Sequence, residues 1–343
     1  MMDKVVLGKT GIEVTRLGFG GIPIQRSDER QAVDTVIHAL HKGIDFIDTS
    51  RAYTTSERRI GMALRESGKS AILATKSLEQ KADAIRRDID VSLKELGREK
   101  IEIYQCHFVA DFKAYRRVTS GGGALEGLFK AREEGLIGHI GITSHNLDVL
   151  KRAVEDGLFE TIMTCYSFLE PKAAEAVIPG ALARNIGVIV MKPFSGGVIT
   201  DARLAIQYAL ALEGTVVIPG VENREIFDEN WEIFLGNRML DRKERRRIET
   251  IRSGFDKEFC RRCDYCQPCP EKIPIQHILG IKFFAKRMGL ETLKAKWLKD
   301  SVNKARKCTE CGACMERCPY GLPIPDLIKE NIAWVDKQLS SRR

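Results

Sequence analysis

Short apolar runs alternate with amphipathic stretches over residues 1–240. Eight runs have the length of strands: RLGFGG, DFIDTS, ILATK, IEIYQCH, IGHIGIT, TIMTCY, GVIVMKP and TVVIPG. The stretches between them repeat apolar residues at helical spacing, and several end in Gly, a common helix cap. Because strands and helices alternate strictly, the pattern predicts a parallel sheet of an α/β protein.

Eight strand–helix pairs predict a closed (β/α)8 TIM barrel, which we assign to residues 1–255. The opening segment, KVVLGKTGIEV, predicts a hairpin that turns at Gly8 to Gly11 and plugs one mouth of the barrel. A doubly wound open sheet is the rival fold. Since no GxGxxG motif opens the first helix, the sequence favours the barrel.

Polar residues end three consecutive strands. The second strand ends in Asp48, the third in Lys76 and the fourth in His107, while Tyr53 follows Asp48 in the loop. Each of the three strand-end residues has an ordinary explanation: a helix cap for the aspartate, a solvated side chain for the lysine and a hydrogen-bonded core residue for the histidine. In a β/α barrel, however, the carboxyl ends of the strands form one reactive face. Their coincidence therefore predicts an active site.

The chemistry that suits these four side chains is proton delivery to a carbonyl oxygen. Tyr53 is the expected acid, and a neighbouring Lys76 ammonium would lower its pKa of about 10. Asp48 would pair with Lys76, and His107 would orient the carbonyl. No side chain carries a hydride, so the reaction would need a cofactor.

The segments DTSRAY, ATK and YQCH resemble the Asp, Tyr, Lys and His motifs of the aldo-keto reductase family. The segments GKTG, GITSHN and IPGVENREIFDEN fit the same family in the same order, so the resemblance covers residues 3–240. It implies a (β/α)8 barrel that transfers hydride from NADPH to aldehydes or ketones. The cysteine-rich tail is similar to the family branch that carries a C-terminal ferredoxin-type domain.

The resemblance also implies a dinucleotide site at the ends of the strands. Family members usually have Ser-Asn where this chain has Thr143 and Ser144, and a Lys-Ser pair for the 2′-phosphate where it has Gly220 and Val221. The residues that the resemblance assigns to the cofactor are Gly20, Thr143, Ser144, Lys192, Gly220, Arg224, Glu229 and Asn230. The missing phosphate ligands predict a weak preference for NADP, and they leave NADH or another donor open.

Eight of the ten cysteines lie in two runs near the end of the chain, CRRCDYCQPCP and CTECGACMERCP. The spacing of the second run is typical of bacterial ferredoxins with two [4Fe-4S] clusters, in which the fourth cysteine of each run binds the other cluster; the first run is one residue shorter before its fourth cysteine. One set is therefore Cys260, Cys263, Cys266 and Cys318, and the other is Cys308, Cys311, Cys314 and Cys269. Structural zinc is the alternative.

Residues 256–343 are predicted to form an α-helical ferredoxin-like domain. The segment between the cysteine runs, HILGIKFFAKRMGLETLKAKWLKDS, has a helical pattern, and Phe283, Phe284 and Trp297 are assigned to its core. Cys106 and Cys165 fall in barrel strands and are predicted to be inert core residues.

The net charge of +8 lies entirely beside the cysteines. Residues 260–343 hold 17 Lys and Arg against 9 Asp and Glu, whereas residues 1–259 hold 38 of each. Two clusters of roughly −2 each would offset much of this surplus. The remainder predicts an acidic redox partner such as a ferredoxin or flavodoxin rather than nucleic acid. No apolar run has the length of a membrane span or signal peptide, so we expect a cytoplasmic protein without a membrane partner.

Two classes of function remain. The first is an oxidoreductase that reduces or oxidises a small carbonyl or alcohol substrate and couples this to iron–sulfur electron transfer. The second is an electron-transfer protein whose barrel is a docking body. Hydride transfer moves two electrons whereas a cluster passes one, so a flavin mediator is left open beside NAD(P)H.

Overall fold

The computed structural model describes residues 2–236, 238–255 and 258–340, apart from the side chain of residue 287. The chain divides into two compact units, Met1–Arg246 and Arg247–Arg343. The division falls within helix α11 (Arg242–Phe255). The boundary placed after residue 255 from the sequence stays a prediction.

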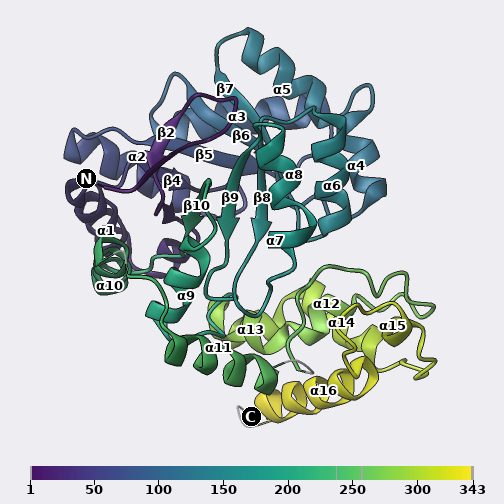
Figure 1. Cartoon of the computed structure of the whole chain (residues 1–343). Helices are drawn as coiled ribbons and strands as arrows, with labels where there is room; N and C mark the ends of the chain where they lie inside the picture. The colour runs from purple at the N-terminus through teal and green to yellow at the C-terminus, as the bar shows by residue number, and fades with distance from the viewer. Residues whose placement is uncertain (1, 237, 256–257, 341–343) are drawn as a thin grey trace. The chain divides into compact units, whose positions relative to one another are not determined.

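The first unit contains eight parallel strands in sequence order, which confirms the predicted (β/α)8 barrel (Figure 1). Parallel bridges from Leu17 to Val217 and from Gly20 to Gly220 join the first strand to the last. The strands are β3 (Phe19–Gly20), β4 (Phe46–Asp48), β5 (Ile72–Ser77), β6 (Ile101–Cys106), β7 (Ile137–Thr143), β8 (Thr161–Cys165), β9 (Gly187–Met191) and β10 (Thr215–Ile218).

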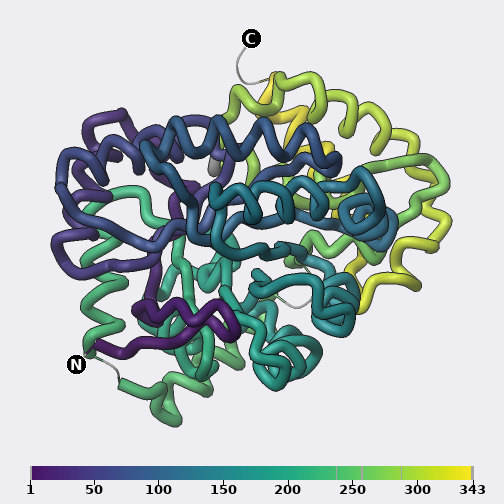
Figure 2. Tube along the Cα trace, turned by 90° about the horizontal axis from the view of Figure 1, so that it is seen from above, coloured from purple at the N-terminus to yellow at the C-terminus, as the bar shows by residue number. Residues whose placement is uncertain are grey.

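Helices surround the strands, and α1 and α10, the first and last of the ring, pack against each other (Figures 1 and 2). The longer helices bury an apolar stripe; in α1, for example, the buried residues Val33, Val36 and Leu40 recur at helical spacing. The helical segments are η1 (Pro23–Arg26), α1 (Glu29–Lys42), α2 (Ser56–Ser67), α3 (Ala82–Leu96), α4 (Phe112–Thr119), α5 (Ala124–Glu133), α6 (Leu147–Asp156), α7 (Ala173–Ala176), α8 (Ile178–Ala183), α9 (Ala202–Leu210) and α10 (Arg224–Gly236).

The predicted hairpin is present as β1 (Lys4–Val6) and β2 (Glu13–Thr15), with Lys4 opposite Thr15. Its turn lies against the start of β9: a Cβ on Gly8 would be 2.4 Å from the carbonyl oxygen of Asn185. Leu7 and Val14 belong to the same buried cluster as the inward residues of the barrel. The hairpin therefore covers the amino-terminal mouth and leaves the carboxyl ends of the strands for chemistry.

Two helical details differ from the sequence-based prediction. Helix α4 was not expected; Asp111 starts it by accepting a hydrogen bond from the backbone N–H of Ala114. The stretch PKAAEAVIPGALARNIG, expected as one helix, forms α7 and α8, separated at Val177. Pro179 lies in the first turn of α8, where its missing N–H is tolerated.

The second unit is helical, as expected for its sequence. Its buried residues include Ile281, Leu298 and Ile328. The segment between the cysteine runs is not one helix, because it breaks at Gly280 and again at Gly289, which has a φ of +82°. The elements are α12 (Ile275–Leu279), α13 (Ile281–Met288), η2 (Leu290–Lys294), α14 (Lys296–Ala305), α15 (Ala313–Glu316) and α16 (Ile324–Ser340).

The aromatic residues assigned to the core of this unit are only partly buried. Trp297 is 40% exposed, so that assignment is wrong for this residue. It still stacks edge-on against Phe284, with ring centroids 5.4 Å apart. In the barrel, Cys106 and Cys165 are buried as predicted.

Candidate functional site

Asp48 and Lys76 form a buried ion pair at the ends of the neighbouring strands β4 and β5. Lys76 Nζ donates hydrogen bonds to Asp48 Oδ1 at 2.6 Å, to Asp48 Oδ2 at 2.7 Å and to the carbonyl oxygen of Thr49 at 2.7 Å. Lys76 is only 1% exposed and Asp48 only 3% exposed. Burial alone would lower the pKa of Lys76, but Asp48 and Tyr53 outweigh it and raise the pKa, so the ammonium form is retained.

Tyr53 lies directly beside this ion pair, in the loop after β4. Its ring centroid is 5.2 Å from Lys76 Nζ, and its ring stands at 86° to that of His107, with centroids 5.8 Å apart. Tyr53 is one of the groups that raise the pKa of Lys76. By the same interaction, the positive charge of Lys76 favours the phenolate form of Tyr53.

His107 follows β6 and completes the group. Burial, followed by the charges of Lys76 and Lys192, holds the pKa of His107 well below its usual value of 6.5. The imidazole is therefore neutral near pH 7 and carries a single N–H. Its Nδ1 lies 3.0 Å from Ser50 Oγ. The structure thus brings together the three residues that the sequence placed at strand ends and Tyr53 from the loop after β4.

Two glycines allow the first and last strands to approach closely at the same rim. The N–H of Gly20 donates to the carbonyl oxygen of Pro219 at 2.9 Å. A Cβ on Gly20 would lie 2.6 Å from that oxygen, and one on Gly220 would lie 2.9 Å from Pro23 Cγ. Neither position therefore has room for a side chain; Gly20 is buried, whereas Gly220 is exposed. Their assignment to a cofactor stays a prediction.

Thr143 and Ser144, at the end of β7, are buried and already make local hydrogen bonds. Thr143 Oγ1 accepts from the N–H of Phe108 at 2.7 Å. Ser144 Oγ donates to the carbonyl oxygen of Val109 at 2.6 Å and accepts from the N–H of Asn146 at 3.0 Å. The Thr143 hydroxyl keeps its proton for another acceptor, whereas that of Ser144 is in use.

Lys192 lies just after β9 in a left-handed backbone conformation, with a φ of +61°. Its Nζ is 2.8 Å from Nε2 of His145, the histidine of GITSHN. The His145 ring packs against Phe108, with centroids 4.8 Å apart. Lys192 therefore adds positive charge to the rim that carries His107.

The residues predicted to contact adenosine lie on α10. Asn230 is 1% exposed, and within the described ranges neither polar atom of its side chain has a hydrogen-bond partner. Leaving such an amide unsatisfied costs about 1–3 kcal/mol, so its environment suits a ligand that offers both a donor and an acceptor. Glu229 and Arg224 are exposed, and Arg224 lies 4.0 Å from Asp34.

Three features of the rim were not found from the sequence. Ser50 contacts His107, Gln105 Nε2 lies 3.4 Å from Asp48 Oδ2, and Arg26 pairs with a glutamate almost 200 residues away, Glu222, at 2.7 Å. Gln105 could have been noticed, because it lies two residues before His107 and so shares its face of the strand. The other two contacts depend on loop conformation and have no local signal.

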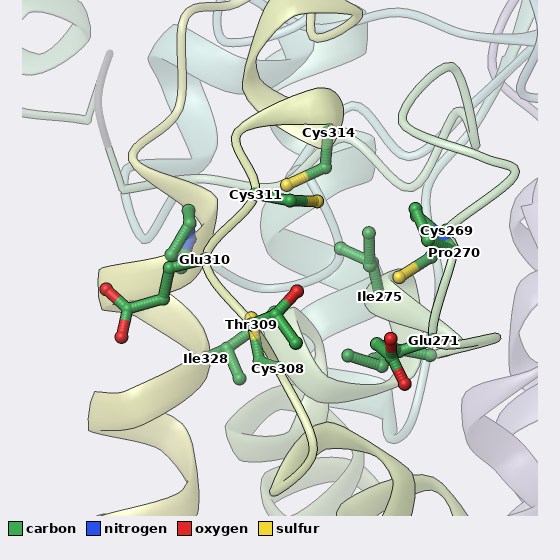
Figure 3. A pocket seen from close by; sticks show the side chains of 12 residues that line it. Cys269, Pro270, Glu271, Ile275, Cys308, Thr309, Glu310, Cys311, Cys314 and Ile328 are labelled. Atoms are coloured by element: carbon green, nitrogen blue, oxygen red, sulfur yellow. The ribbon is translucent and has the colours of Figure 1, made fainter.

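In the second unit, the eight cysteines of the tail line two cavities in the groups that the sequence indicated. One cavity is lined by Cys260, Cys263, Cys266 and Cys318, together with Arg261, Arg262 and Tyr320 among others. The other is lined by Cys269, Cys308, Cys311 and Cys314, whose side chains surround a common space in Figure 3. In the part of the chain that the structure describes, no three His, Cys, Asp or Glu side chains converge on one ion position.

Burial disfavours the thiolate form of the cysteines in the first cavity. Burial raises the pKa of Cys260 to about 11 and that of Cys263 to about 12. The backbone N–H groups of Arg262 and Tyr265 hydrogen-bond to these two sulfurs and act in the opposite direction. Arg261 is 6% exposed, and its guanidinium lies 4.3 Å from the ring centroid of Tyr320. Thiolates held here therefore suit iron, whose charge offsets the burial cost.

Comparison with protein-family models resolves what these two units are. The model of the aldo/keto reductase family matches residues 16–203, more than half of the chain. The chain belongs to the aldo/keto reductase family. A 4Fe-4S dicluster domain model matches residues 259–322, so this family member also carries an iron–sulfur domain.

Relatives of established name are moderately similar to this aldo/keto reductase. L-galactose dehydrogenase from Arabidopsis thaliana is 30% identical over 214 residues, which are 57% of this chain and 66% of the relative. The aldo-keto reductase YhdN from Bacillus subtilis is 28% identical over 58% of this chain and 64% of the relative. The chain thus spans slightly less than two thirds of these two relatives. NADH-specific methylglyoxal reductase from Escherichia coli is 28% identical over 58% of this chain and 69% of the relative.

Solved structures of the family have the same barrel. A putative aldo-keto reductase from Pseudomonas aeruginosa is 27% identical, covers 68% of this chain with 95% of its own length, and has a TM-score of 0.60. The holo form of an aldo-keto reductase from Bacillus halodurans is 23% identical, with 73% and 96% of the two chains covered and a TM-score of 0.63, and supports the fold alone. Among the helices in the described ranges, none combines the length and the hydropathy needed to span a bilayer.

Proposed function

We propose that this aldo/keto reductase reduces a small aldehyde or ketone, or oxidises the corresponding alcohol, at the rim formed by Asp48, Tyr53, Lys76 and His107. The observation that supports this most is the Lys76 ammonium, buried, bonded to Asp48 at 2.6 Å and 5.2 Å from the ring of Tyr53. A buried charge is costly unless it is paired. A cation kept beside a phenol is well suited to activating proton transfer.

Each residue has a defined part in the proposed reaction. When bound, a reduced nicotinamide supplies the hydride to the carbonyl carbon. Tyr53 delivers the proton to the oxygen, and Lys76 stabilises the phenolate that remains. Asp48 keeps Lys76 charged and in place. The N–H of neutral His107 holds the carbonyl oxygen next to Tyr53.

The nucleotide site has residues that fit a dinucleotide, although its phosphate ligands are few. The unsatisfied amide of Asn230 suits an adenine edge, which offers both a donor and an acceptor. Glu222 directly follows Gly220 and Val221, the positions expected to hold a 2′-phosphate, and its carboxylate pairs with Arg26 at 2.7 Å. A carboxylate accepts hydrogen bonds from the hydroxyls of a ribose, whereas its negative charge disfavours a phosphate at the same place. We therefore infer that NADH serves at least as well as NADPH.

The two cysteine cavities would each hold one [4Fe-4S] cluster and exchange electrons with an acidic redox partner. The surplus of positive charge in residues 260–343 supports such a partner. Because a cluster passes one electron while hydride transfer moves two, a flavin would have to mediate if the two units are coupled. The second candidate function, an electron-transfer protein with an inactive barrel, is favoured by the scarcity of phosphate ligands.

Substitution of Tyr53→Phe tests the proposal. With NADH and methylglyoxal as the probe pair, chosen from the Escherichia coli relative, we expect a fall in kcat of roughly 10²–10⁴ with the dissociation constant of NADH unchanged. Tyr115→Phe is the matched control, because it removes a phenol that bonds Asp156 in the helical ring. Unchanged turnover in Tyr53→Phe would remove Tyr53 from the mechanism. If a redox partner reduces the clusters of the unsubstituted protein but that protein reduces no carbonyl substrate, the second candidate function is supported.

A further inference from the structure

Ser50 lies at the centre of a small hydrogen-bond network that includes the backbone carbonyl of Lys76 and the ring of His107. It is 1% exposed. Its Oγ lies 3.0 Å from the backbone carbonyl oxygen of Lys76, 3.0 Å from His107 Nδ1 and 3.1 Å from the N–H of Ala52, which donates to it. Ser50 thus contacts the backbone of Lys76 and the ring of His107, the residue that would orient the substrate.

A serine hydroxyl has one proton, so it can donate to only one of the two remaining neighbours. If it donates to the carbonyl oxygen of Lys76, His107 must carry its proton on Nδ1 to complete the contact. If it donates to His107, Nδ1 is the acceptor and the imidazole proton lies on Nε2. The direction of this single bond therefore selects the tautomer of a neutral His107.

The carbonyl oxygen of Lys76 does not depend on Ser50, because it already accepts from the N–H of Arg51 at 3.0 Å. Turning the hydroxyl toward His107 leaves that oxygen satisfied. Only the Nε2–H tautomer can donate a hydrogen bond to a carbonyl oxygen while Nδ1 is held by Ser50. Both the hydrogen bonding of the Lys76 carbonyl and the orientation of the substrate are therefore satisfied when Ser50 donates to Nδ1 and the proton of His107 lies on Nε2.

We propose that Ser50 is a positioning residue, whose hydroxyl donates to His107 Nδ1 and so fixes the tautomer that presents Nε2–H to the substrate. This inference rests on the proposed function for its consequence in catalysis, but not for its structural content. The low pKa of His107 supports it, because a neutral ring is what makes the choice of tautomer matter.

Nitrogen NMR of the holoprotein with ¹⁵N-labelled histidine measures the tautomer directly. The chain has 6 histidines, and His107→Asn identifies the signals of interest. In the unsubstituted protein near neutral pH we expect the Nδ1 shift of an unprotonated nitrogen and the Nε2 shift of a protonated one. In Ser50→Ala the two shifts should move toward a mixture of tautomers. A protonated Nδ1 in the unsubstituted protein, or shifts unchanged in Ser50→Ala, would overturn the proposal.

Kinetics give the second readout. Ser50→Ala should lower kcat/KM for methylglyoxal by about tenfold, a loss typical of one hydrogen bond, and Ser50→Thr should recover activity and the original shifts. Ser92→Ala is the matched control, since it removes an equally buried hydroxyl that donates to Glu57 at 2.8 Å. The control should leave the His107 signals in place; if it shifts them equally, the effect is general loosening and Ser50 has no special role. Because the NMR readout needs no turnover, it remains decisive even if Tyr53→Phe disproves the catalytic proposal.

Discussion

Replacing Asp48 by Asn should destabilise the barrel strongly, because it leaves the Lys76 ammonium without its counter-charge. The side chains are close in size and shape, so packing changes little. The amide oxygen can still accept one hydrogen bond, but the two bonds at 2.6 and 2.7 Å to a carboxylate are lost as charge-assisted contacts.

Two independent arguments give the size of the effect. Removing one partner of a buried ion pair costs about 3–5 kcal/mol. The cost also has a ceiling, since Lys76 can escape by losing its proton. Holding a lysine neutral at pH 7, when its unperturbed pKa is about 10.4, costs about 4.6 kcal/mol at 1.36 kcal/mol per pH unit. We therefore expect a loss of about 3–5 kcal/mol in the free energy of unfolding.

The dependence on pH should change sign. In the unsubstituted protein the pKa of Lys76 is raised, so the stability that the pair provides is present at neutral pH and is lost as the pH rises through the folded-state pKa. In Asp48→Asn the folded-state pKa would lie below the unfolded one. The variant should then gain stability as the pH rises from 7 toward about 10, since the unfolded chain binds the extra proton.

The measurement must follow the barrel alone, because a chain of two compact units need not unfold in one step. Trp231, 3% exposed on α10, is the tryptophan of the barrel, and the other two lie in the second unit. Fluorescence-monitored urea unfolding in a Trp297→Phe, Trp334→Phe background isolates it. The double variant Asp48→Leu, Lys76→Met is the control and should recover much of the stability without activity. A loss below about 0.5 kcal/mol in Asp48→Asn, or the same pH slope as the parent, would refute the reasoning.

Three further predictions concern the cofactors and His107. Protein purified without oxygen should be brown and contain about eight iron atoms, and Cys318→Ser and Cys269→Ser should each lose the cluster of the opposite cysteine run and retain about four; stoichiometric zinc without iron would contradict this. Titration of the cluster-free protein should give dissociation constants for NADH and NADPH within about tenfold of each other, because each missing charged contact to a 2′-phosphate costs about 1.5–3 kcal/mol; a hundredfold preference for NADPH would exclude the idea. The unfolding free energy of the barrel should fall on acidification below pH 6.5, by at most about 1.4 kcal/mol per pH unit. The reason is that His107 takes up a proton in the unfolded chain but stays neutral in the folded one, where its pKa is lowered. His107→Gln should remove this pH dependence, and an unaltered pH dependence in the variant would count against a depressed pKa of His107.

The barrel fold and the position of its reactive residues could be predicted from the sequence pattern. Eight apolar runs in alternation with helices have few alternatives once a parallel sheet must bury both faces. Asp48, Lys76 and His107 could be placed together without coordinates, because parallel strands end at one rim whatever the loops do. The grouping of Cys318 with Cys260 followed from spacing in the same way, since ferredoxin-type runs exchange their last cysteine.

The contacts among the polar side chains of the rim could not be predicted without the folded structure. The contact of Ser50 with His107, the pairing of Arg26 with Glu222 and the unsatisfied amide of Asn230 depend on how loops and helices far apart in sequence are packed. Periodicity also could not show that the helix between the cysteine runs breaks at Gly280 and Gly289, because an amphipathic pattern continues through both positions. Hydrophobic patterning records which face of an element is buried, whereas the direction of a hydrogen bond is settled by a few tenths of an ångström between side chains that the chain brings together only when it folds.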